Sequence, residues 1–181
     1  MRIAITGGIA EGKSTVLSHL KDLGKRTDSA DSIARKVFLQ NDVQEAISKI
    51  VKISLPIQTH LLRDEISRDA SLRRKVNRIL HPRILTEIEM SEAQYFEVPL
   101  LLETCVQGLY DQIWVVTCGP AEQLLRLSAR VGDMGEAKRL ISTQLPSIVK
   151  CAFADQIIRT NGPDDVVKVE IGQILAFEDV R

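Results

Sequence analysis

The chain of 181 residues is poor in aromatic side chains, which make up 4% of it, and it has only three cysteines. It has no apolar run of about 18 residues, the length that a membrane-spanning helix needs. The first apolar segment begins directly after Met1, which leaves no room for a cleavable signal. These scarcities favour a cytoplasmic protein with an aliphatic core and exclude a membrane span.

The cysteines Cys105, Cys118 and Cys151 are odd in number and far apart. Their spacing matches neither a disulfide framework nor a metal-binding motif. We therefore expect three reduced thiols, as is usual in the cytoplasm.

The chain also lacks an excess of charge of either sign, with 24 basic and 24 acidic side chains and a formal net charge of zero. This balance argues against nucleic acid and against an anionic membrane as partners. Apolar residues make up 44% of the chain, which is ordinary for a globular protein with a core. The length suits one α/β domain with a modest insert, as a monomer or small homo-oligomer.

What the chain does contain is a glycine-rich phosphate-binding motif. Residues 7–14 read GGIAEGKS and match the P-loop pattern G-x-x-x-x-G-K-[ST]. An apolar run over residues 2–6 predicts a buried strand before the motif, and helical spacing over residues 14–23 predicts a helix after it, closed by Gly24. Strand, glycine loop and helix together form the structural setting in which this motif binds a polyphosphate.

In that setting backbone N–H groups surround the phosphates, and the positive end of the helix dipole faces them. Lys13 would reach the β and γ phosphates of ATP, and the Ser14 hydroxyl would hold Mg²⁺. The predicted nucleotide-binding residues are Gly8, Ile9, Ala10, Glu11, Gly12, Lys13, Ser14 and Thr15.

Beyond the loop, short apolar runs alternate with helical patterns, which predicts a mostly parallel sheet. The predicted strands cover residues 95–98, 112–117 and 156–160, and a short strand is assigned to residues 25–29 because a crossover is due there. Helices are predicted over residues 120–130 and 136–153 and from Asp164 onward. The core comprises about residues 1–30, 94–125 and 154–181, with a helical insert over about 31–93 and a lid over about 126–150.

Within the insert, Pro56 interrupts the helical pattern, and His81-Pro82 is predicted to open a new helix with proline at its first position. His19, on the helix after the phosphate loop, is predicted to lie on the surface. The three histidines do not cluster in the sequence.

Two acidic residues stand where chemistry would need them. Asp31 begins a predicted helix just after the second strand, where it would either orient or deprotonate an acceptor hydroxyl or simply cap the helix. Both interpretations stand on the pattern alone. Glu97 lies within an apolar strand, where a carboxylate is costly unless it is paired or linked to a metal, so it is a candidate to support Mg²⁺ through water.

A basic cluster runs from Arg126 through Arg130 to Lys138 and Arg139. Arg126 and Arg130 share a helical face, and two glycines in the intervening segment, Gly132 and Gly135, would act as hinges. The cluster is either a lid that carries arginines onto phosphates or a solvated helix face with a flexible turn.

Several segments together resemble the dephospho-coenzyme A kinase family over nearly the whole chain. They are TGGI at residues 6–9 with the P-loop, ADSIAR at 30–35, ILHPRI at 79–84, VPLLLE at 98–103, QLP at 144–146 with Lys150, and ADQII at 154–158 with Asn161. A P-loop alone fits many unrelated nucleotide-binding proteins, but these segments in this order are far more specific.

The resemblance implies transfer of the ATP γ-phosphate to the 3′-hydroxyl of dephospho-coenzyme A, with Mg²⁺. It implies a P-loop NTPase fold with a five-stranded parallel sheet in the order 2-3-1-4-5, helices on both faces, an inserted helical substrate-binding domain and a lid. Asp31 then becomes the base or the hydroxyl-orienting group, and Arg130 a lid arginine near the phosphates. His81, Pro99, Leu100 and Glu103 would line the substrate side.

The chain departs from the family pattern at a few positions. Ser29 stands where the family usually has Asp, Glu97 replaces an Asp, and Gln58-Thr59 replaces an Asp-Arg pair. Arg130 is followed by Val131 where an Asp is usual. Two alternatives also stay open: a kinase for another small hydroxyl or nucleotide acceptor, and a nucleotide-binding regulatory protein without transfer activity.

Overall fold

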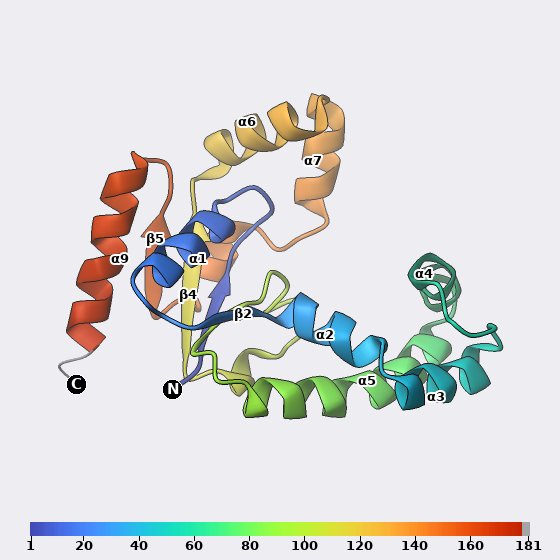
Figure 1. Ribbon diagram of the computed structural model, residues 1–181. Helices are drawn as coiled ribbons and strands as arrows, with labels where there is room; N and C mark the ends of the chain where they lie inside the picture. The colour runs from blue at the N-terminus through green and yellow to red at the C-terminus, as the bar shows by residue number, and fades with distance from the viewer. Residues whose placement is uncertain (179–181) are drawn as a thin grey trace. The chain divides into compact units, whose positions relative to one another are not determined.

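In the computed structural model, which describes residues 1–178, the strands form one parallel sheet. The sheet has the order β2-β3-β1-β4-β5 (Figure 1). Its strands are β1 (Ile3–Thr6), β2 (Thr27–Ser29), β3 (Tyr95–Glu97), β4 (Gln112–Thr117) and β5 (Gln156–Arg159). The predicted strand order is therefore confirmed, and each predicted strand is present with its ends shifted by at most two residues.

The helices lie between the strands in chain order. They are α1 (Lys13–Asp22), α2 (Ala30–Phe38), α3 (Asn41–Val51), α4 (Thr59–Arg68), α5 (Ala70–Met90), the 3₁₀ turn η1 (Gln107–Leu109), α6 (Pro120–Val131), α7 (Met134–Ser142), α8 (Ser147–Cys151) and α9 (Asp164–Glu178). No helix of the described part of the chain is both long and apolar enough to cross a membrane.

The chain divides into two compact units. The first comprises residues 1–29 and 93–181 and holds the whole sheet, although its last three residues lie outside the described part. The second comprises residues 30–92 and consists of α2 to α5. In the second unit α5 packs against α2, α3 and α4, and Val37, Ile47, Leu62 and Val76 are buried.

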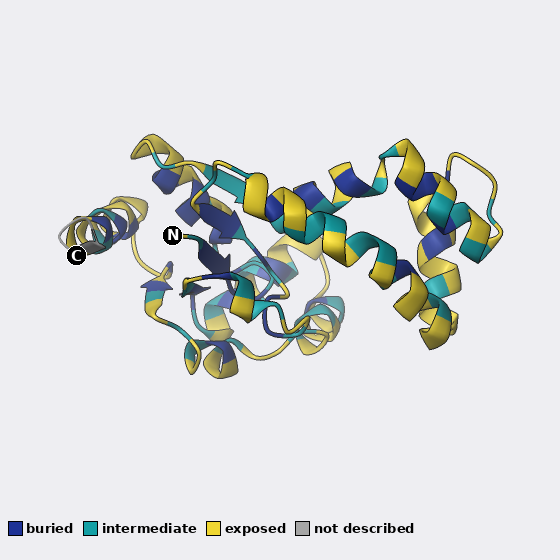
Figure 2. Cartoon of the chain, turned by 90° about the horizontal axis from the view of Figure 1, so that it is seen from below, coloured by how far each residue is buried: buried dark blue, intermediate teal, exposed yellow. Residues whose placement is uncertain are grey.

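The main core of the first unit lies between the sheet and the pair of helices α1 and α9, which pack side by side (Figure 1). Ile3 and Ile5 of β1, Leu20 of α1 and Ile171 of α9 are fully buried there. The connection from β1 to β2 runs toward one edge of the sheet, and the connection from β4 to β5 runs toward the other edge. Because such connections are right-handed, α1 and α8 lie on opposite faces of the sheet. Buried positions follow the strands and the inward faces of the helices (Figure 2).

The structure corrects several helix predictions. His81-Pro82 does not open a helix, because α5 runs unbroken from Ala70 to Met90 with Pro82 inside it. The start is fixed instead by Asp69, whose carboxylate accepts hydrogen bonds from the Ser71 and Leu72 amides.

The helix predicted over residues 136–153 is in fact two helices, α7 and α8. The break covers residues 143–146 and ends at Pro146, since a residue preceding proline is disfavoured in the helical conformation.

His19 is also not on the surface: it is buried on α1, and its Nε2 lies 3.0 Å from Asp164 Oδ1 at the start of α9. Asp31 is not an N-cap, because α2 begins one residue earlier, at Ala30.

Candidate phosphate-binding site

The glycine-rich loop runs from the end of β1 to the start of α1, as the sequence predicts. Gly12 stands just before α1 with φ of 90°, and a Cβ there would lie 2.8 Å from Thr160 Oγ1. Gly7 has φ of 151°, and a Cβ there would lie 2.3 Å from the Val116 carbonyl oxygen. Both glycines are therefore required by backbone conformation and by the close approach of Val116 in β4 and of Thr160 just after β5.

Lys13 is buried in the first turn of α1 and folds back over the loop. Its Nζ donates hydrogen bonds to the carbonyl oxygens of Gly7, at 3.1 Å, and Gly8, at 2.8 Å. Ser14, the next residue, is exposed. The ammonium group is thus held at the loop itself, beside the N-terminus of α1, where an anion is favoured.

Glu11 is the least expected member of the loop, because it is a carboxylate only 1% exposed inside a segment that binds anions. It accepts hydrogen bonds from the Gly8 amide, from Thr117 Oγ1 at 3.0 Å and from Ser147 Oγ. Its own backbone carbonyl accepts a 2.7 Å bond from Thr160 Oγ1. The loop is therefore joined to the ends of β4 and β5 and to α8.

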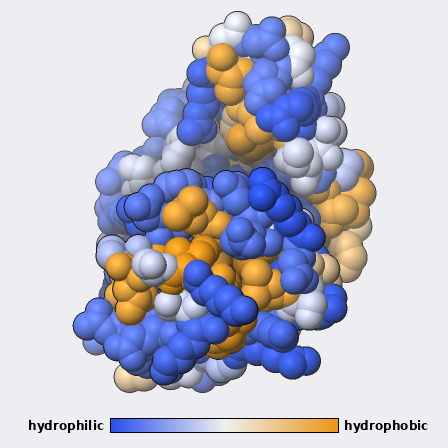
Figure 3. Space-filling view, turned by 90° about the vertical axis from the view of Figure 1, so that its right-hand side faces the viewer, coloured by the Kyte–Doolittle hydropathy of each residue, from blue (hydrophilic) through white to orange (hydrophobic). Residues whose placement is uncertain are grey.

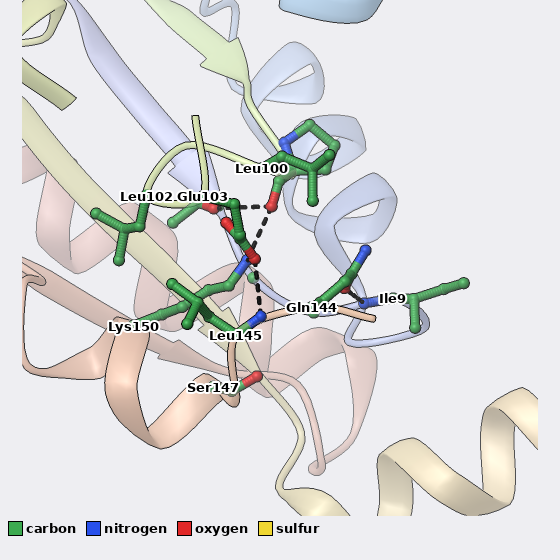
Figure 4. Close-up of polar contacts among 12 residues, drawn as sticks. Ile9, Leu100, Leu102, Glu103, Gln144, Leu145, Ser147 and Lys150 are labelled. Atoms are coloured by element: carbon green, nitrogen blue, oxygen red, sulfur yellow. Dashed lines mark hydrogen bonds and ion pairs between the residues drawn. The ribbon is translucent and has the colours of Figure 1, made fainter. Parts of the chain in front are cut away.

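Ile9, at the tip of the loop, is held by two glutamines from distant parts of the chain. Gln123 Nε2 of α6 donates to its carbonyl oxygen at 3.0 Å, and Gln144 Oε1 accepts from its amide at 2.9 Å. Figure 4 shows the contact of Gln144. Ala10, between Ile9 and Glu11, has φ of 61°, a left-handed conformation that costs an alanine about 1 kcal/mol.

The basic cluster after β4 divides into paired and unpaired arginines. Arg126 binds Glu122 at 2.8 Å and the Thr160 carbonyl at 2.6 Å, and Arg139 binds Glu136 on its own helix. Arg130 is exposed near the end of α6 and has no partner among residues 1–178. Gly132 ends α6 with φ of 78°, whereas Gly135 lies inside α7. Of the two glycines predicted to act as hinges, only Gly132 therefore lies in the connection between the helices.

On the other side of the loop, the segment after β3 carries three predicted substrate residues. Pro99 accepts a hydrogen bond from Thr6 Oγ1 of β1 at 3.4 Å, and Leu100 is partly exposed. Glu103 forms an ion pair with Lys150 at 2.9 Å and accepts from the Leu145 amide at 3.0 Å (Figure 4). Oε1 of Glu103 is therefore bound internally, whereas its buried Oε2 has no hydrogen-bond partner among the described residues.

The pKa of Glu103 is set by opposing causes. Burial raises it, but the hydrogen bond from Lys150 and the amides of Glu103 and Leu145 outweigh burial and hold the pKa below its usual value. Glu103 is thus a carboxylate that its neighbours keep ionised.

Glu97 is the last residue of β3 and is half-buried, level with Ile5 of β1 and Ser29 of β2 in the sheet. No group of three or more His, Cys, Asp or Glu residues able to hold a metal ion occurs within residues 1–178. Mg²⁺ in phosphoryl-transfer sites needs only one or two protein ligands besides phosphate and water, and the exposed Ser14 hydroxyl at the start of α1 is an oxygen donor of that kind.

Asp31 and His81 belong to the second unit. Asp31 lies in the first turn of α2 and His81 in the middle of α5, and both are exposed. Figure 3 views the molecule from the side on which α3 and α4 lie in Figure 1, and hydrophobic side chains gather there among hydrophilic ones. Leu39, Leu55 and Leu61 are the large exposed hydrophobic residues near these helices.

A cavity of about 730 Å³ adjoins the phosphate loop within the first unit. Glu11 and Thr117 line it beside the loop, and Gln144, Ser147 and Asn161 line it from later segments. Concave sites of this size with a few convergent polar groups are typical of ligand-binding pockets.

Sequence reasoning missed most of the residues that hold the loop. Gln123 and Thr117 carried no signal, because nothing local shows that an amide or a hydroxyl will meet a segment more than a hundred residues away. Gln144 belonged to a segment that resembled the family pattern, but the pattern did not indicate its partner.

A parallel sheet in the order 2-3-1-4-5, with a GxxxxGKS loop between β1 and the N-terminus of α1, defines a P-loop kinase. The family model for dephospho-CoA kinase matches residues 1–165 of this chain. The chain is 31% identical over 197 residues to the dephospho-CoA kinase of Shouchella clausii, which covers 97% of this chain and 98% of that protein. The chain therefore belongs to the dephospho-CoA kinase family.

Solved structures agree on the fold. The protein TT1252 from Thermus thermophilus matches with a TM-score of 0.82 and 21% identity, covering 100% of this chain and 98% of that one. The dephospho-CoA kinase from Campylobacter jejuni matches with a TM-score of 0.60 and 22% identity, covering 97% of this chain and 95% of that one.

Proposed function

We propose that the phosphate loop, Asp31 and Arg130 divide between them the work of the family's reaction, the phosphorylation of dephospho-CoA by ATP. The observation that carries the proposal is the phosphate loop at the N-terminus of α1, with the Lys13 ammonium held against it. Phosphoryl transfer asks a protein mainly to position the reactants and to neutralise charge on the moving group.

Lys13 and the amides of the loop hold the ATP phosphates, except for the amides of Gly8 and Ile9, which donate to Glu11 and Gln144. When ATP binds, the Lys13 ammonium exchanges the carbonyl oxygens of Gly7 and Gly8 for phosphate oxygens, which are stronger partners because they are charged. Arg130, which has no partner among the described residues, is the guanidinium of the lid that is available to stabilise the transferred phosphoryl group.

Asp31 accepts the proton of the ribose 3′-hydroxyl or orients that hydroxyl for attack. Its exposed carboxylate and its place in the first turn of α2 support this role. His81, Pro99 and Leu100 line the substrate side. Glu103 lines the substrate side with them. Its Oε1 keeps the segment after β3 in place, and its Oε2 has no hydrogen-bond partner among the described residues.

Mg²⁺ supplies further charge neutralisation when it is bound with ATP. The Ser14 hydroxyl would be its protein ligand, and Glu97 would support it through water. The three free cysteines favour the cytoplasm as the location of the protein.

The test is ADP release with ATP, Mg²⁺ and dephospho-CoA, with mass spectrometry of the product. Lys13→Ala is expected to lower turnover at least about a hundredfold, and the matched control is Lys21→Ala, an exposed lysine on the same helix. Wild-type turnover by Lys13→Ala would refute the phosphate role.

Asp31→Asn is expected to retain ATP binding and to lose about a hundredfold or more in transfer. Its control is Asp64→Asn, another exposed aspartate of the second unit. Full transfer by Asp31→Asn would remove the base assignment. Acceptor-dependent ADP release with a different acceptor alone would favour another small-molecule kinase, and ATP binding without release on any acceptor would favour a regulatory protein.

A further inference from the structure

The segment between α7 and β5 contacts the phosphate loop at two places. We call residues 144–150 the strap. Gln144 Oε1 of the strap accepts from the Ile9 amide at 2.9 Å, and Ser147 Oγ donates to the buried carboxylate of Glu11. These contacts join positions 135 and 136 residues apart in the chain.

Leu145 and Lys150 of the strap bind the segment that follows β3 (Figure 4). Lys150 is fully buried, and its Nζ donates to the Pro99 carbonyl at 2.9 Å and pairs with Glu103 at 2.9 Å. The Leu145 amide donates to the same Glu103 oxygen. The buried ion pair of Lys150 holds the strap to the segment after β3. Gln144 and Ser147 therefore contact the loop from a fixed position.

The residue between the two contact points is strained. Ala10 has φ of 61°, and its neighbours Ile9 and Glu11 are the residues that the strap holds. An alanine adopts a left-handed conformation only where the surrounding structure imposes it. Gln123 and Thr117 also bind these two neighbours, at the Ile9 carbonyl and at Glu11 Oε1. The strap contacts therefore restrict the backbone conformation of the loop around Ala10.

We propose that Gln144 and Ser147 are positioning residues that hold the phosphate loop in the shape that binds ATP, by imposing the left-handed conformation of Ala10. Gln144 lies directly after α7, and Gln123 lies on α6, so both ends of the α6–α7 hairpin hold Ile9. Any movement of that hairpin which shifts Gln144 breaks its bond to the loop. The position of the α6–α7 hairpin and the affinity of the loop for ATP are therefore linked.

The proposal makes a specific prediction about Ala10→Gly. Glycine adopts a positive φ about as readily as a negative one, so a loop with glycine at position 10 keeps its shape with less help from the strap. Loss of Gln144 should then weaken ATP binding in the native loop, but much less in the Ala10→Gly loop. A glutamine that only stabilised the fold would show no such dependence on residue 10.

The experiment measures ATP affinity by calorimetry, and the KM values for ATP and dephospho-CoA, on the full chain. Gln144→Ala is expected to weaken ATP binding about fivefold, the factor that one neutral hydrogen bond of about 1 kcal/mol represents. Ser147→Ala is expected to weaken it at least as much, because its hydroxyl donates to a carboxylate. The KM for dephospho-CoA should not change. Ser128→Ala is the matched control, since its hydroxyl donates to the Leu125 carbonyl of its own helix and does not line the cavity.

The double variant Ala10→Gly/Gln144→Ala is expected to bind ATP within about twofold of Ala10→Gly alone, which would correspond to a coupling of the two sites. An equal loss in both backgrounds would overturn the proposal, as would an unchanged ATP affinity in Gln144→Ala and Ser147→Ala. The proposal rests on ATP binding at the phosphate loop. Calorimetry of the wild type and of Lys13→Ala tests that premise separately, because its failure would appear in those two proteins.

Discussion

Glu103 Oε1 lies 2.9 Å from the Nζ of Lys150, and that lysine has no exposed surface at all. The pair joins the segment after β3 to α8, and the same oxygen also accepts from the Leu145 amide. A buried ion pair is expensive to break, because the remaining charge has no water to solvate it.

Glu103→Gln should therefore lower the free energy of unfolding by about 3 kcal/mol or more at pH 7. The measurement is urea denaturation followed by circular dichroism. The control is Glu136→Gln, which removes an exposed carboxylate paired with Arg139 within α7 and should change stability little. A loss for Glu103→Gln no larger than for the control would mean that the pair is not a strong contributor.

The same pair predicts a dependence of stability on acid. The pKa of Glu103 lies below its usual value of 4.5 in the folded chain, so its carboxylate stabilises the fold fully above pH 4.5. That contribution is lost as the pH falls through the lowered folded pKa. The stability gap between the wild type and Glu103→Gln should thus be constant from pH 7 to about pH 5 and narrow below it. Denaturation curves across this range check it, and a constant gap down to pH 3 would contradict it.

Tyr110 offers a substitution that should not destabilise the fold. Its hydroxyl is buried without a hydrogen-bond partner among the described residues, and burial raises its pKa to about 12. Its ring packs near Phe96, with 5.9 Å between the ring centroids. Tyr110→Phe keeps the ring and removes the unpaired hydroxyl, so stability should be unchanged or rise by up to about 1 kcal/mol. A thermal melt that shows a clear loss would reveal a partner for the hydroxyl.

Arg130 should be distinguishable from its neighbours by kinetics. Arg130→Ala is expected to lower kcat about a hundredfold, with little effect on thermal stability, because the side chain is exposed and makes no internal contact among residues 1–178. Arg139→Ala is the matched control, since that guanidinium is paired with Glu136 on the same helix. A kcat for Arg130→Ala equal to that of the wild type would remove Arg130 from the reaction.

Local patterns predicted most of the sheet because the strands other than β2 are short apolar runs bounded by turn residues. The run over residues 112–117 is β4 with the same ends, and the phosphate loop lies between β1 and α1 as its motif requires. Strand β2 had no such pattern. Its half-buried residues Thr27, Asp28 and Ser29 pair with β3 at the sheet edge, so it could only be inferred from the need for a crossover.

Patterns failed where a helix boundary depended on tertiary packing. Proline at a helix start is a favourable signal, yet Pro82 lies inside α5, whose Val76 and Ile88 are buried on either side of it. His19 was misplaced for a related reason. Its helical position does not reveal that Asp164, 145 residues further on, meets its ring.

The sequence by itself determined that this chain has a phosphate loop on a parallel α/β sheet and that it resembles one kinase family. Each of these features depends on short runs of neighbouring residues. Only the tertiary structure decided how the loop is held. The partners of Ile9 and Glu11 come from α6, β4 and the strap, and their side chains meet only when the sheet brings its strand ends together. Hydrogen bonds need atoms within about 3 Å, and no linear pattern encodes that distance between residues over a hundred positions apart.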